Sequence, residues 1–318
     1  MVVVIAIVAV ILVLVAVVLI RTLSLKPTAA QSAVIELDKS ERALSYGEKL
    51  SKMIQVETIS EPHQQDRSKF LEFHKVLEKE FPNVHRVCEK NVLNGSLLFC
   101  WKGSGEKEPI MLMSHHDVVE AGGEWEHAPF SGDIDETGRV WGRGTVDTKA
   151  SLCCIFGAIE ELIEEGFKPP MDVYIASSCT EEVSGDGGPA IAYFLKEKGV
   201  KLDLILDEGG MILEAPIGGV NGIYAMVGVV EKGYGDVKFI AHGNGGHASA
   251  PGKNTPLVRL GKFMADIEKK NPFKAQFTPT VREMFTRMAP NMSFPLKMIM
   301  ANLWLFEGLL TKLLPSIN

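Results

Sequence analysis

The sequence predicts an α/β protein with a layered, mostly parallel sheet and helices on both faces. Short apolar runs suited to strands alternate with amphipathic segments suited to helices. Several of these runs are followed at once by a histidine or a carboxylate. The composition, 46% hydrophobic and 23% charged, provides for a buried core, and 318 residues suffice for one large domain or two.

The amino-terminal segment differs from the rest of the chain. Val2–Ile20 consists of 19 residues that are all Val, Ile, Ala or Leu. This is long enough to cross a bilayer as one helix and longer than the usual apolar core of a signal peptide. We expect a single transmembrane anchor over residues 1–25 and a linker over residues 26–40. A secretion signal cleaved after Thr28-Ala29-Ala30 is the alternative, and a buried helix is disfavoured because the segment has no polar face.

The membrane orientation stays open. Arg21 and Lys26 follow the apolar segment, and no basic residue precedes it. Taken literally, the positive-inside rule places the carboxyl side in the cytoplasm. If the start codon were assigned too late, an upstream basic segment would be missing from the sequence, and the predicted orientation would be reversed. We therefore expect a single-pass membrane protein without fixing the side on which the rest of the chain lies.

The segment before residue 102 predicts two helices and a hairpin. Apolar residues recur at helical spacing over Glu41–Val56 and Asp66–Phe81. Val84–Cys88 and Leu97–Trp101 are suited to short strands, and Asn94-Gly95 between them is typical of a tight hairpin turn.

The middle of the chain predicts the parallel part of the sheet. Strands are expected over Pro109–Met113, Met171–Cys179 and Leu202–Leu206. Between them, Thr145–Gly166 and a segment near Gly188–Lys198 have the length and apolar spacing of helices. Strands that alternate with such helices usually pair in parallel.

The pattern changes after Gly218. Ile223–Glu231 and Gly235–Ala241 alternate as strands do, and a glycine-rich loop follows from His242 to Pro251. Thr255–Lys269 predicts a helix. Phe273–Asn318 contains apolar residues and several prolines, and its pattern favours no particular structure.

Polar side chains gather at one predicted edge of the sheet. His115, Glu181, Glu182 and Asp207 each lie just past the carboxyl end of an expected strand, and Asp147 lies where a loop enters a helix. Ligands of open α/β sheets bind outside the carboxyl ends of the strands. Adjacent buried carboxylates such as Glu181 and Glu182 also need a cation or a shared proton. The sequence therefore predicts a metal site at this edge.

The residue types suggest how that site works. His115 and Asp117 point the same way on an extended chain, so Asp117 can hold one imidazole nitrogen while the other binds metal. Asp147 has two oxygens to bridge two ions, and Glu182 and Asp207 supply one hard ligand to each. One nitrogen with several carboxylates suits zinc, manganese or cobalt.

Glu181 then remains without a ligand role. Two neighbouring ions would share a water and lower its pKa, and Glu181 is placed to take the proton as general base. Taken singly, each feature also has a plain structural reading. His115-x-Asp117 is then a polar loop, Asp147 a helix cap, and the glutamate pair an exposed strand end.

Charge and cysteine content exclude several classes. The net charge of −7, without a basic run, argues against a nucleic-acid partner. The five cysteines form no CxxC or CxxH pattern, which argues against a disulfide framework or a structural zinc finger.

The motifs together resemble the dinuclear zinc exopeptidase family, which includes aminoacylase-1, carboxypeptidase S, glutamate carboxypeptidases and succinyl-diaminopimelate desuccinylase. The matching stretches, in family order, are Ser114-His115-His116-Asp117, Trp125…Pro129-Phe130, Gly142-Arg-Gly-Thr-Val-Asp147-Thr-Lys149, Thr180-Glu181-Glu182, Asp207-Glu-Gly-Gly and Gly246-His247-Ala-Ser-Ala-Pro251. The resemblance runs from about Glu41 to the end of the chain. The Trp304-Leu-Phe-Glu307 neighbourhood and the membrane-proximal start are most similar to the carboxypeptidase S and N-acyl-amino-acid hydrolase branch.

The resemblance implies a function and a role for each residue. It implies two Zn²⁺ ions, with Co²⁺ or Mn²⁺ as substitutes, that hydrolyse an amide bond in a dipeptide or N-acyl amino acid. His115 and Asp207 would bind one ion, Glu182 the other, and Asp147 both, across a peptide bond to Thr148 that is often cis in the family. Asp117 would orient His115, and Glu181 would be the general base.

The resemblance also implies a lid domain inserted into the catalytic domain. His247 matches a lid histidine that helps to hold the substrate, often across a homodimer, although a simple turn histidine is the alternative. We expect the first part of the catalytic domain over residues 41–229 and an incomplete α+β lid over residues 230–318. No histidine follows His247, so the second ion would lack its histidine ligand.

This absence predicts a fragment of a longer protein. Two rival functions also stay open. One is a catalytically inactive, membrane-anchored fragment that binds metal or a partner. The other is an aminopeptidase of the same fold, which would prefer substrates with a free amine.

Overall fold

The computed structural model describes residues 1–27, 38, 40–229, 233, 235–247, 249–250, 252–270, 272–273 and 275–313. The chain forms two compact units, Ile35–Glu208 and a second unit that joins Met1–Val34 to Gly209–Asn318. The possible cleavage site at Thr28-Ala29-Ala30, most of the expected linker, and Pro251 lie outside the described residues. The predicted domain boundaries stay predictions.

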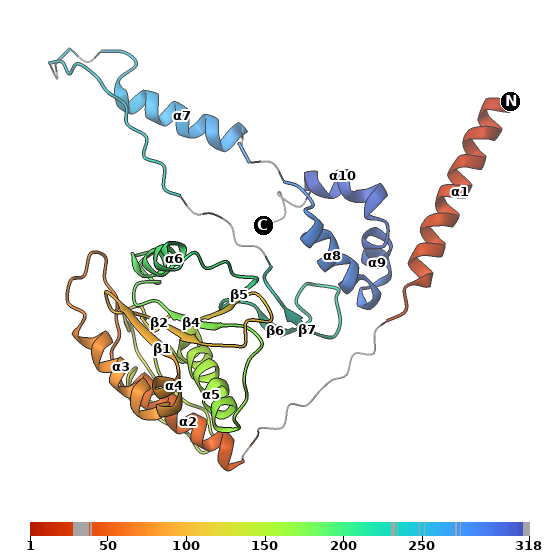
Figure 1. Ribbon diagram of the computed structural model, residues 1–318. Helices are drawn as coiled ribbons and strands as arrows, with labels where there is room; N and C mark the ends of the chain where they lie inside the picture. The colour runs from red at the N-terminus through yellow and green to blue at the C-terminus, as the bar shows by residue number, and fades with distance from the viewer. Residues whose placement is uncertain are drawn as a thin grey trace. The chain divides into compact units, whose positions relative to one another are not determined.

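A five-stranded mixed sheet forms the centre of the unit Ile35–Glu208 (Figure 1). Its strands, in spatial order, are β1 (Glu89–Leu93), β2 (Ser96–Trp101), β4 (Val173–Ser177), β3 (Ile110–Met113) and β5 (Leu204–Leu206). β3 pairs in parallel with β4 and with β5, whereas β2 pairs antiparallel with β1 and with β4. The expected mostly parallel sheet is therefore mixed in its pairing: two of the four pairings between the described strands are parallel and two are antiparallel, because β2 runs opposite to the other four strands.

The predicted hairpin turn is confirmed. Leu93 pairs with Ser96, so only Asn94 and Gly95 connect the two strands. Both have positive φ angles, 49° and 92°. Such a two-residue turn requires left-handed backbone at both positions, which Asn and Gly tolerate best.

Helices cover both faces of the sheet, as predicted (Figure 1). The helices of this unit are α2 (Glu41–Ile54), α3 (Ser68–Glu80), α4 (Pro82–Val87), α5 (Ala150–Glu164) and α6 (Gly187–Glu197). Leu97, Phe99 and Trp101 of β2 face a core cluster that includes Phe73 of α3 and Phe156 of α5. The alternate residues Leu98 and Cys100 face Ile191 and Leu195 of α6. Successive side chains of one strand thus build two cores.

The strand predicted over Val84–Cys88 is wrong, because Pro82–Val87 forms helix α4. Pro82 occupies the start of the helix, where a missing N–H costs little. The carboxylate of Glu160 accepts hydrogen bonds from the backbone N–H groups of Asn83 and Val84, at 2.9 and 2.8 Å. A distant side chain thus caps the helix, while Val84 is fully buried.

Buried His74 gives this unit a pH-dependent stability. Burial lowers the pKa of His74 to about 4, against the opposing effect of its hydrogen bond with the Gly95 carbonyl. Between pH 6.5 and 4 the unfolded chain binds this proton and the folded chain does not. The free energy of unfolding should therefore fall as the pH drops through this window, by at most about 1.4 kcal/mol per pH unit from this residue.

We predict that His74→Gln flattens this dependence. Glutamine keeps an N–H donor for the Gly95 carbonyl but does not titrate. Urea unfolding of the full chain with chelator present, compared at pH 6.5 and 4.5, measures the slope. The matched exposed variant His242→Gln should keep the wild-type slope, and an equal slope in all three proteins would show that His74 is not the cause.

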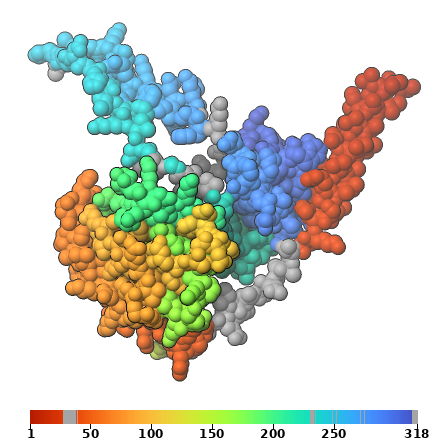
Figure 2. All heavy atoms as spheres, in the orientation of Figure 1, coloured from red at the N-terminus to blue at the C-terminus, as the bar shows by residue number. Residues whose placement is uncertain are grey.

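The second unit contains the amino-terminal helix and the carboxyl-terminal elements (Figure 2). They are α1 (Val2–Ser24), β6 (Met211–Glu214), β7 (Ile223–Met226), α7 (Pro256–Lys270), α8 (Pro279–Met288), a 3₁₀ turn (Ala289–Asn291), α9 (Phe294–Met300) and α10 (Leu303–Leu313). β6 and β7 pair antiparallel. The described residues of the predicted strand Gly235–Ala241 form no strand, so that prediction is wrong. The alternating pattern was not sufficient, since these side chains are largely exposed.

Helix α1 is long and apolar enough to cross a membrane. It has 23 residues, and an 18-residue window within it has a mean hydropathy of 3.8; signal sequences and buried helices share these properties. Val18 and Thr22 are its buried residues.

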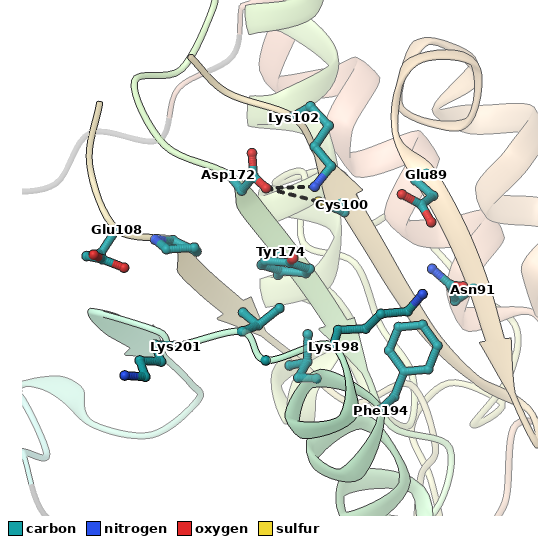
Figure 3. Close-up of a pocket in the computed structure, with 14 residues that line it drawn as sticks. Glu89, Asn91, Cys100, Lys102, Glu108, Asp172, Tyr174, Phe194, Lys198 and Lys201 are labelled. Atoms are coloured by element: carbon teal, nitrogen blue, oxygen red, sulfur yellow. Dashed lines mark hydrogen bonds and ion pairs between the residues drawn. The ribbon is translucent and has the colours of Figure 1, made fainter. Parts of the chain in front are cut away.

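A hollow of about 500 Å³ lies at the amino edge of the parallel strands (Figure 3). Its lining includes Glu108 before β3, Asp172 before β4 and Lys201 before β5. Asp172 forms a 2.8 Å ion pair with Lys102. The predicted metal site belongs to the opposite, carboxyl edge, so this hollow is not part of it.

Candidate metal centre

The carboxyl edge of the parallel strands places the predicted site residues. His115 follows β3, Glu181 and Glu182 follow β4, and Asp207 and Glu208 directly follow β5. Asp147 lies in the tight turn Thr145–Lys149 that leads into α5. Its peptide bond to Thr148 is cis, as the family resemblance implies.

His115 is held at one nitrogen and surrounded by acids at the other. Its buried ring places Nδ1 2.9 Å from the carbonyl oxygen of Asp117. Nε2 lies 3.0 Å from Oδ1 of Asp147, 3.2 Å from Oε2 of Glu208 and 3.8 Å from Oε2 of Glu181. Burial lowers the pKa of His115, but the Asp117 hydrogen bond and the charges of Glu208, Asp117 and Glu181 outweigh it and raise the pKa to about 10.

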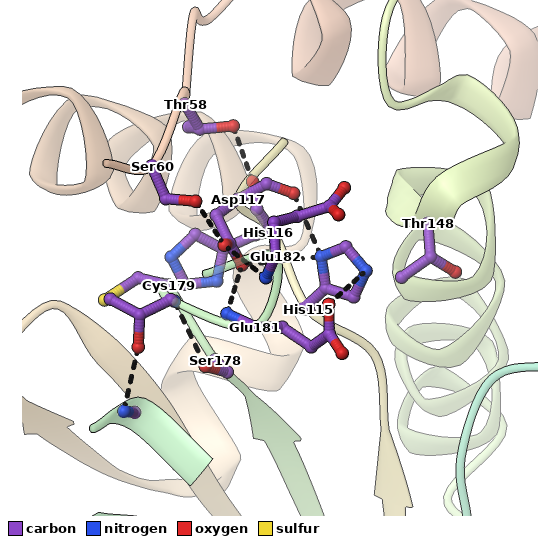
Figure 4. Close-up of polar contacts among 12 residues, drawn as sticks. Thr58, Ser60, His115, His116, Asp117, Thr148, Ser178, Cys179, Glu181 and Glu182 are labelled. Carbon is purple, nitrogen blue, oxygen red and sulfur yellow. Dashed lines mark hydrogen bonds and ion pairs between the residues drawn. The ribbon is translucent and has the colours of Figure 1, made fainter. Parts of the chain in front are cut away.

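Asp117 connects the imidazole to the glutamate pair (Figure 4). Its fully buried carboxylate accepts hydrogen bonds from the backbone N–H groups of Glu181 and Glu182, both at 3.1 Å. It also accepts the Ser60 hydroxyl at 2.7 Å. Burial alone would raise the pKa of Asp117, but the hydrogen bonds with His115 and Ser60 lower it below its ordinary value. This carboxylate therefore stays charged and fixes both the ring and the loop after β4.

The remaining carboxylates crowd one another. Burial raises the pKa of Glu181, Glu182 and Glu208, and the charge of Asp147 raises each of them further, while His115 opposes the rise. Asp147 and Glu181 keep exposed side chains, at 68% and 51%. The site is thus a partly open cluster of negative charge around one imidazole nitrogen.

Two overlapping groups of side chains have the spacing of metal ligands. His115, Asp147 and Glu182 bring one ligand atom each within 4.8 Å of one another, and so do His115, Glu181 and Glu208. A single imidazole with carboxylate oxygens suits zinc, manganese or cobalt, and cysteine takes no part in either group. The donor set therefore fits the expected metal.

Residues 111–297 match the pattern of the Peptidase family M20/M25/M40, which is more than half of the chain. The chain belongs to the Peptidase family M20/M25/M40. Members of this family depend on metal, typically zinc.

Curated relatives agree with this assignment. The chain is 35% identical over 287 residues to a protein named probable carboxypeptidase S-like 2 of Dictyostelium discoideum, with 86% of this chain and 54% of that protein covered. It is 35% identical over 316 residues to N-fatty-acyl-amino acid synthase/hydrolase PM20D1 of Xenopus tropicalis, covering 94% and 61%. It is 35% identical over 248 residues to carboxypeptidase S of Saccharomyces cerevisiae, covering 72% and 42%. The chain spans about half the length of the curated relatives it matches.

The structure brings most of the predicted residues of this M20/M25/M40 member together. His115, Asp147, Glu181 and Glu182 share the cluster, and Asp117 supports it. Asp207 lies close enough for its charge to raise the pKa of Glu181, but its Oδ1 accepts the backbone N–H of Glu208. Glu208 contacts His115 in its place. His247 belongs to the other unit, where its Nδ1 lies 2.8 Å from the Ser249 hydroxyl.

Sequence reasoning missed three residues around the site. The sequence contained a signal that could have identified Glu208 as a site residue, because Asp207-Glu208 repeats the carboxylate pair of Glu181-Glu182. Ser60 had none: it comes from the loop after α2, which the parallel bridge between Ile59 and Val118 brings beside Asp117. Lys149 is fully buried, and its Nζ donates hydrogen bonds to the carbonyls of Met53 and Val56, which ties the Asp147 turn to that loop.

Proposed function

We propose that this chain carries the metal centre of an amide hydrolase that acts on a small carboxylate-bearing substrate, either a dipeptide or an N-acyl amino acid. The observation that carries the proposal is the convergence of His115 with Asp147, Glu181, Glu182 and Glu208 at one edge of the sheet. Membership of a family of metal-dependent peptidases supports it.

Each side chain has a proposed task. His115, Asp147 and Glu182 hold two zinc ions together with an acid from the end of β5, Asp207 or Glu208, and Co²⁺ or Mn²⁺ can replace zinc. Bound zinc would polarise the amide carbonyl and lower the pKa of the attacking water.

Glu181 is the proposed general base. It takes the proton of the attacking water and passes it to the nitrogen of the leaving amine. Its carboxylate is suited to this because the backbone is held by Asp117 while the side chain stays half exposed. Asp117 acts through His115 and the loop after β4 as a positioning residue.

The substrate class comes from the relatives. Carboxypeptidase S and the N-fatty-acyl-amino acid synthase/hydrolase are named for substrates that carry a free carboxylate. His247 is proposed to contact that carboxylate, with a homodimer through the lid as the proposed assembly. We further propose that α1 anchors the protein in a membrane as a single span.

A substrate panel tests the function. The 318-residue chain, purified in detergent and loaded with zinc, is offered an N-acyl amino acid, a dipeptide and the same compounds with amidated carboxyl termini. We expect the compounds with a free carboxylate to react about 10- to 100-fold faster than their amidated counterparts. A rate ratio of this size corresponds to one or two hydrogen bonds to a charged group.

Two outcomes would contradict the proposal. Equal rates with amidated compounds that keep a free amine would indicate an aminopeptidase. Zinc binding without any turnover would favour the inactive metal-binding fragment.

A further inference from the structure

The end of α1 is tied to the carboxyl-terminal helices by a buried asparagine. Asn302, in the connection between α9 and α10, is fully buried. Its Nδ2 donates toward the carbonyl of Val18 at 3.3 Å and the hydroxyl of Thr22 at 3.2 Å, as well as toward Met298 of α9. A buried amide keeps its partners because leaving them costs about 1–3 kcal/mol. These bonds therefore fix α9 and α10 against the last turns of α1.

Two basic side chains strengthen this junction. Arg21 Nε donates to the carbonyl of Ala301 at 3.3 Å, and Lys297 Nζ donates to the carbonyl of Leu25. Residues 18–25 include the last turns of α1 and Leu25 just after it, where the uninterrupted apolar run ends at Ile20 and charged residues begin. In a spanning helix this is the level of the lipid headgroups. The red helix and the blue helices meet at this end in Figure 2.

The exposed residues of α9 and α10 are largely apolar. Phe294, Trp304, Leu305 and Leu309 are each about half exposed, at 52, 50, 46 and 55%. Leu305 and Leu309 lie one turn apart on α10, whereas Leu303 of the same helix is buried in the core with Met288 and Met300. Trp304 donates its indole N–H to Asn302, which leaves the ring at the surface beside the end of α1. Tryptophan with one polar contact and an exposed ring is typical of membrane interfaces.

Charge also favours a lipid surface. Residues 275–313 contain four basic and two acidic residues, in a chain whose net charge is −7. Both acids are paired, Glu283 with Arg287 and Glu307 with Arg282. This part of the second unit is therefore positive, which complements anionic headgroups.

We propose that α9 and α10 lie in the headgroup region of an anionic bilayer, with Phe294, Trp304, Leu305 and Leu309 facing the acyl chains. This inference rests on the proposed membrane span of α1 and not on the proposed hydrolysis. α1 and the two helices then form one membrane-bound structure, with the span crossing the bilayer and α9 and α10 lying on its surface.

Quenching by brominated lipid tests the proposal. The full chain is reconstituted at one copy per nanodisc, in phosphatidylcholine and phosphatidylglycerol with or without bromine near the headgroup end of the acyl chains. One copy per disc prevents a second copy from covering the same face. The share of the emission that disappears in Trp304→Phe reports on Trp304, and Trp101→Phe, which removes a core residue of the other unit, serves as control.

We expect bromine to abolish the Trp304 share of the emission and to leave the Trp101 share unchanged. Leu305→Glu with Leu309→Glu should restore the Trp304 emission, whereas Leu257→Glu, at an exposed leucine of α7, should not. Equal Trp304 emission in brominated and plain discs would overturn the proposal. A chain that does not enter the discs at all would overturn it together with the membrane anchor, while the substrate panel in detergent tests hydrolysis separately.

Discussion

Glu181→Gln is expected to lower kcat by about 10²- to 10⁴-fold and to leave the zinc content unchanged. Glutamine preserves the size of the side chain and the backbone N–H that Asp117 accepts, but it cannot take a proton from the attacking water. Steady-state hydrolysis of the best compound in the substrate panel, together with elemental analysis of the same preparation, measures both quantities.

Glu182→Gln provides the matched comparison, since it changes the neighbouring side chain in the same way. Because Glu182 is a proposed zinc ligand, the Glu182→Gln protein should lose bound zinc as well as activity. The geometry makes this contrast decisive, because Glu181 also belongs to one of the two ligand groups around His115. Zinc loss in Glu181→Gln would make it a ligand, and retained turnover would remove it from the chemistry.

Asp117→Asn is expected to weaken zinc binding by about 10- to 100-fold, as removal of a supporting partner of a ligand usually does. The buried carboxylate accepts the backbone N–H groups of Glu181 and Glu182 and faces His115. An amide of the same shape must turn its own N–H₂ group toward some of these donors. Zinc titration monitored against a competing chelator measures the affinity.

The same variant should also destabilise the metal-free protein, because it leaves buried donors unpaired. Ser60→Ala removes a single hydrogen bond to Asp117 and should cost only about 1 kcal/mol of unfolding free energy. Urea unfolding with chelator present compares the two. If Asp117→Asn were no more harmful than Ser60→Ala in both measurements, Asp117 would not be the organising residue of the site.

Local chemistry made some of the fold predictable from sequence. The turn at Asn94-Gly95 requires only two residues that tolerate left-handed backbone. Once it forms, it places the strands on its two sides next to each other. The order of the sheet could not be predicted in the same way, since β2 pairs with β4 across more than 70 residues. Likewise, Val84–Cys88 has the residues of a strand, but the structure has helix α4 there, and Glu160, far along the chain, caps the start of that helix.

Several prolines lie in the carboxyl-terminal segment, whose sequence pattern favours no particular structure. Pro279, Pro290 and Pro295 indicate breaks when read one by one. In the structure they stand in the first turns of α8, the 3₁₀ turn and α9, where proline is well tolerated. Proline can either break a helix or stand at its start, and the sequence does not distinguish the two roles. Tertiary packing around Met288 and Leu303 determines which role each proline has.

The site was predictable to the extent that its residues follow strands. His115, Glu181 and Glu182 could be placed at one edge because the carboxyl ends of parallel strands meet there. The choice between Asp207 and Glu208 depends on which of two adjacent side chains turns inward, which no spacing encodes. Ser60 and Lys149 belong to the supporting structure, and only the folded chain brings them to the site.

Zinc binding by the full chain tests the proposed metal centre most directly. The 318-residue protein and two variants are stripped with chelator, titrated with zinc and measured for bound metal after gel filtration. The proposed centre predicts that the wild type binds zinc, that His115→Ala loses it, and that His127→Ala, which changes an outlying histidine paired with Asp133, retains it. Equal zinc in His115→Ala and in the wild type would contradict the assignment of this edge of the sheet as the metal site.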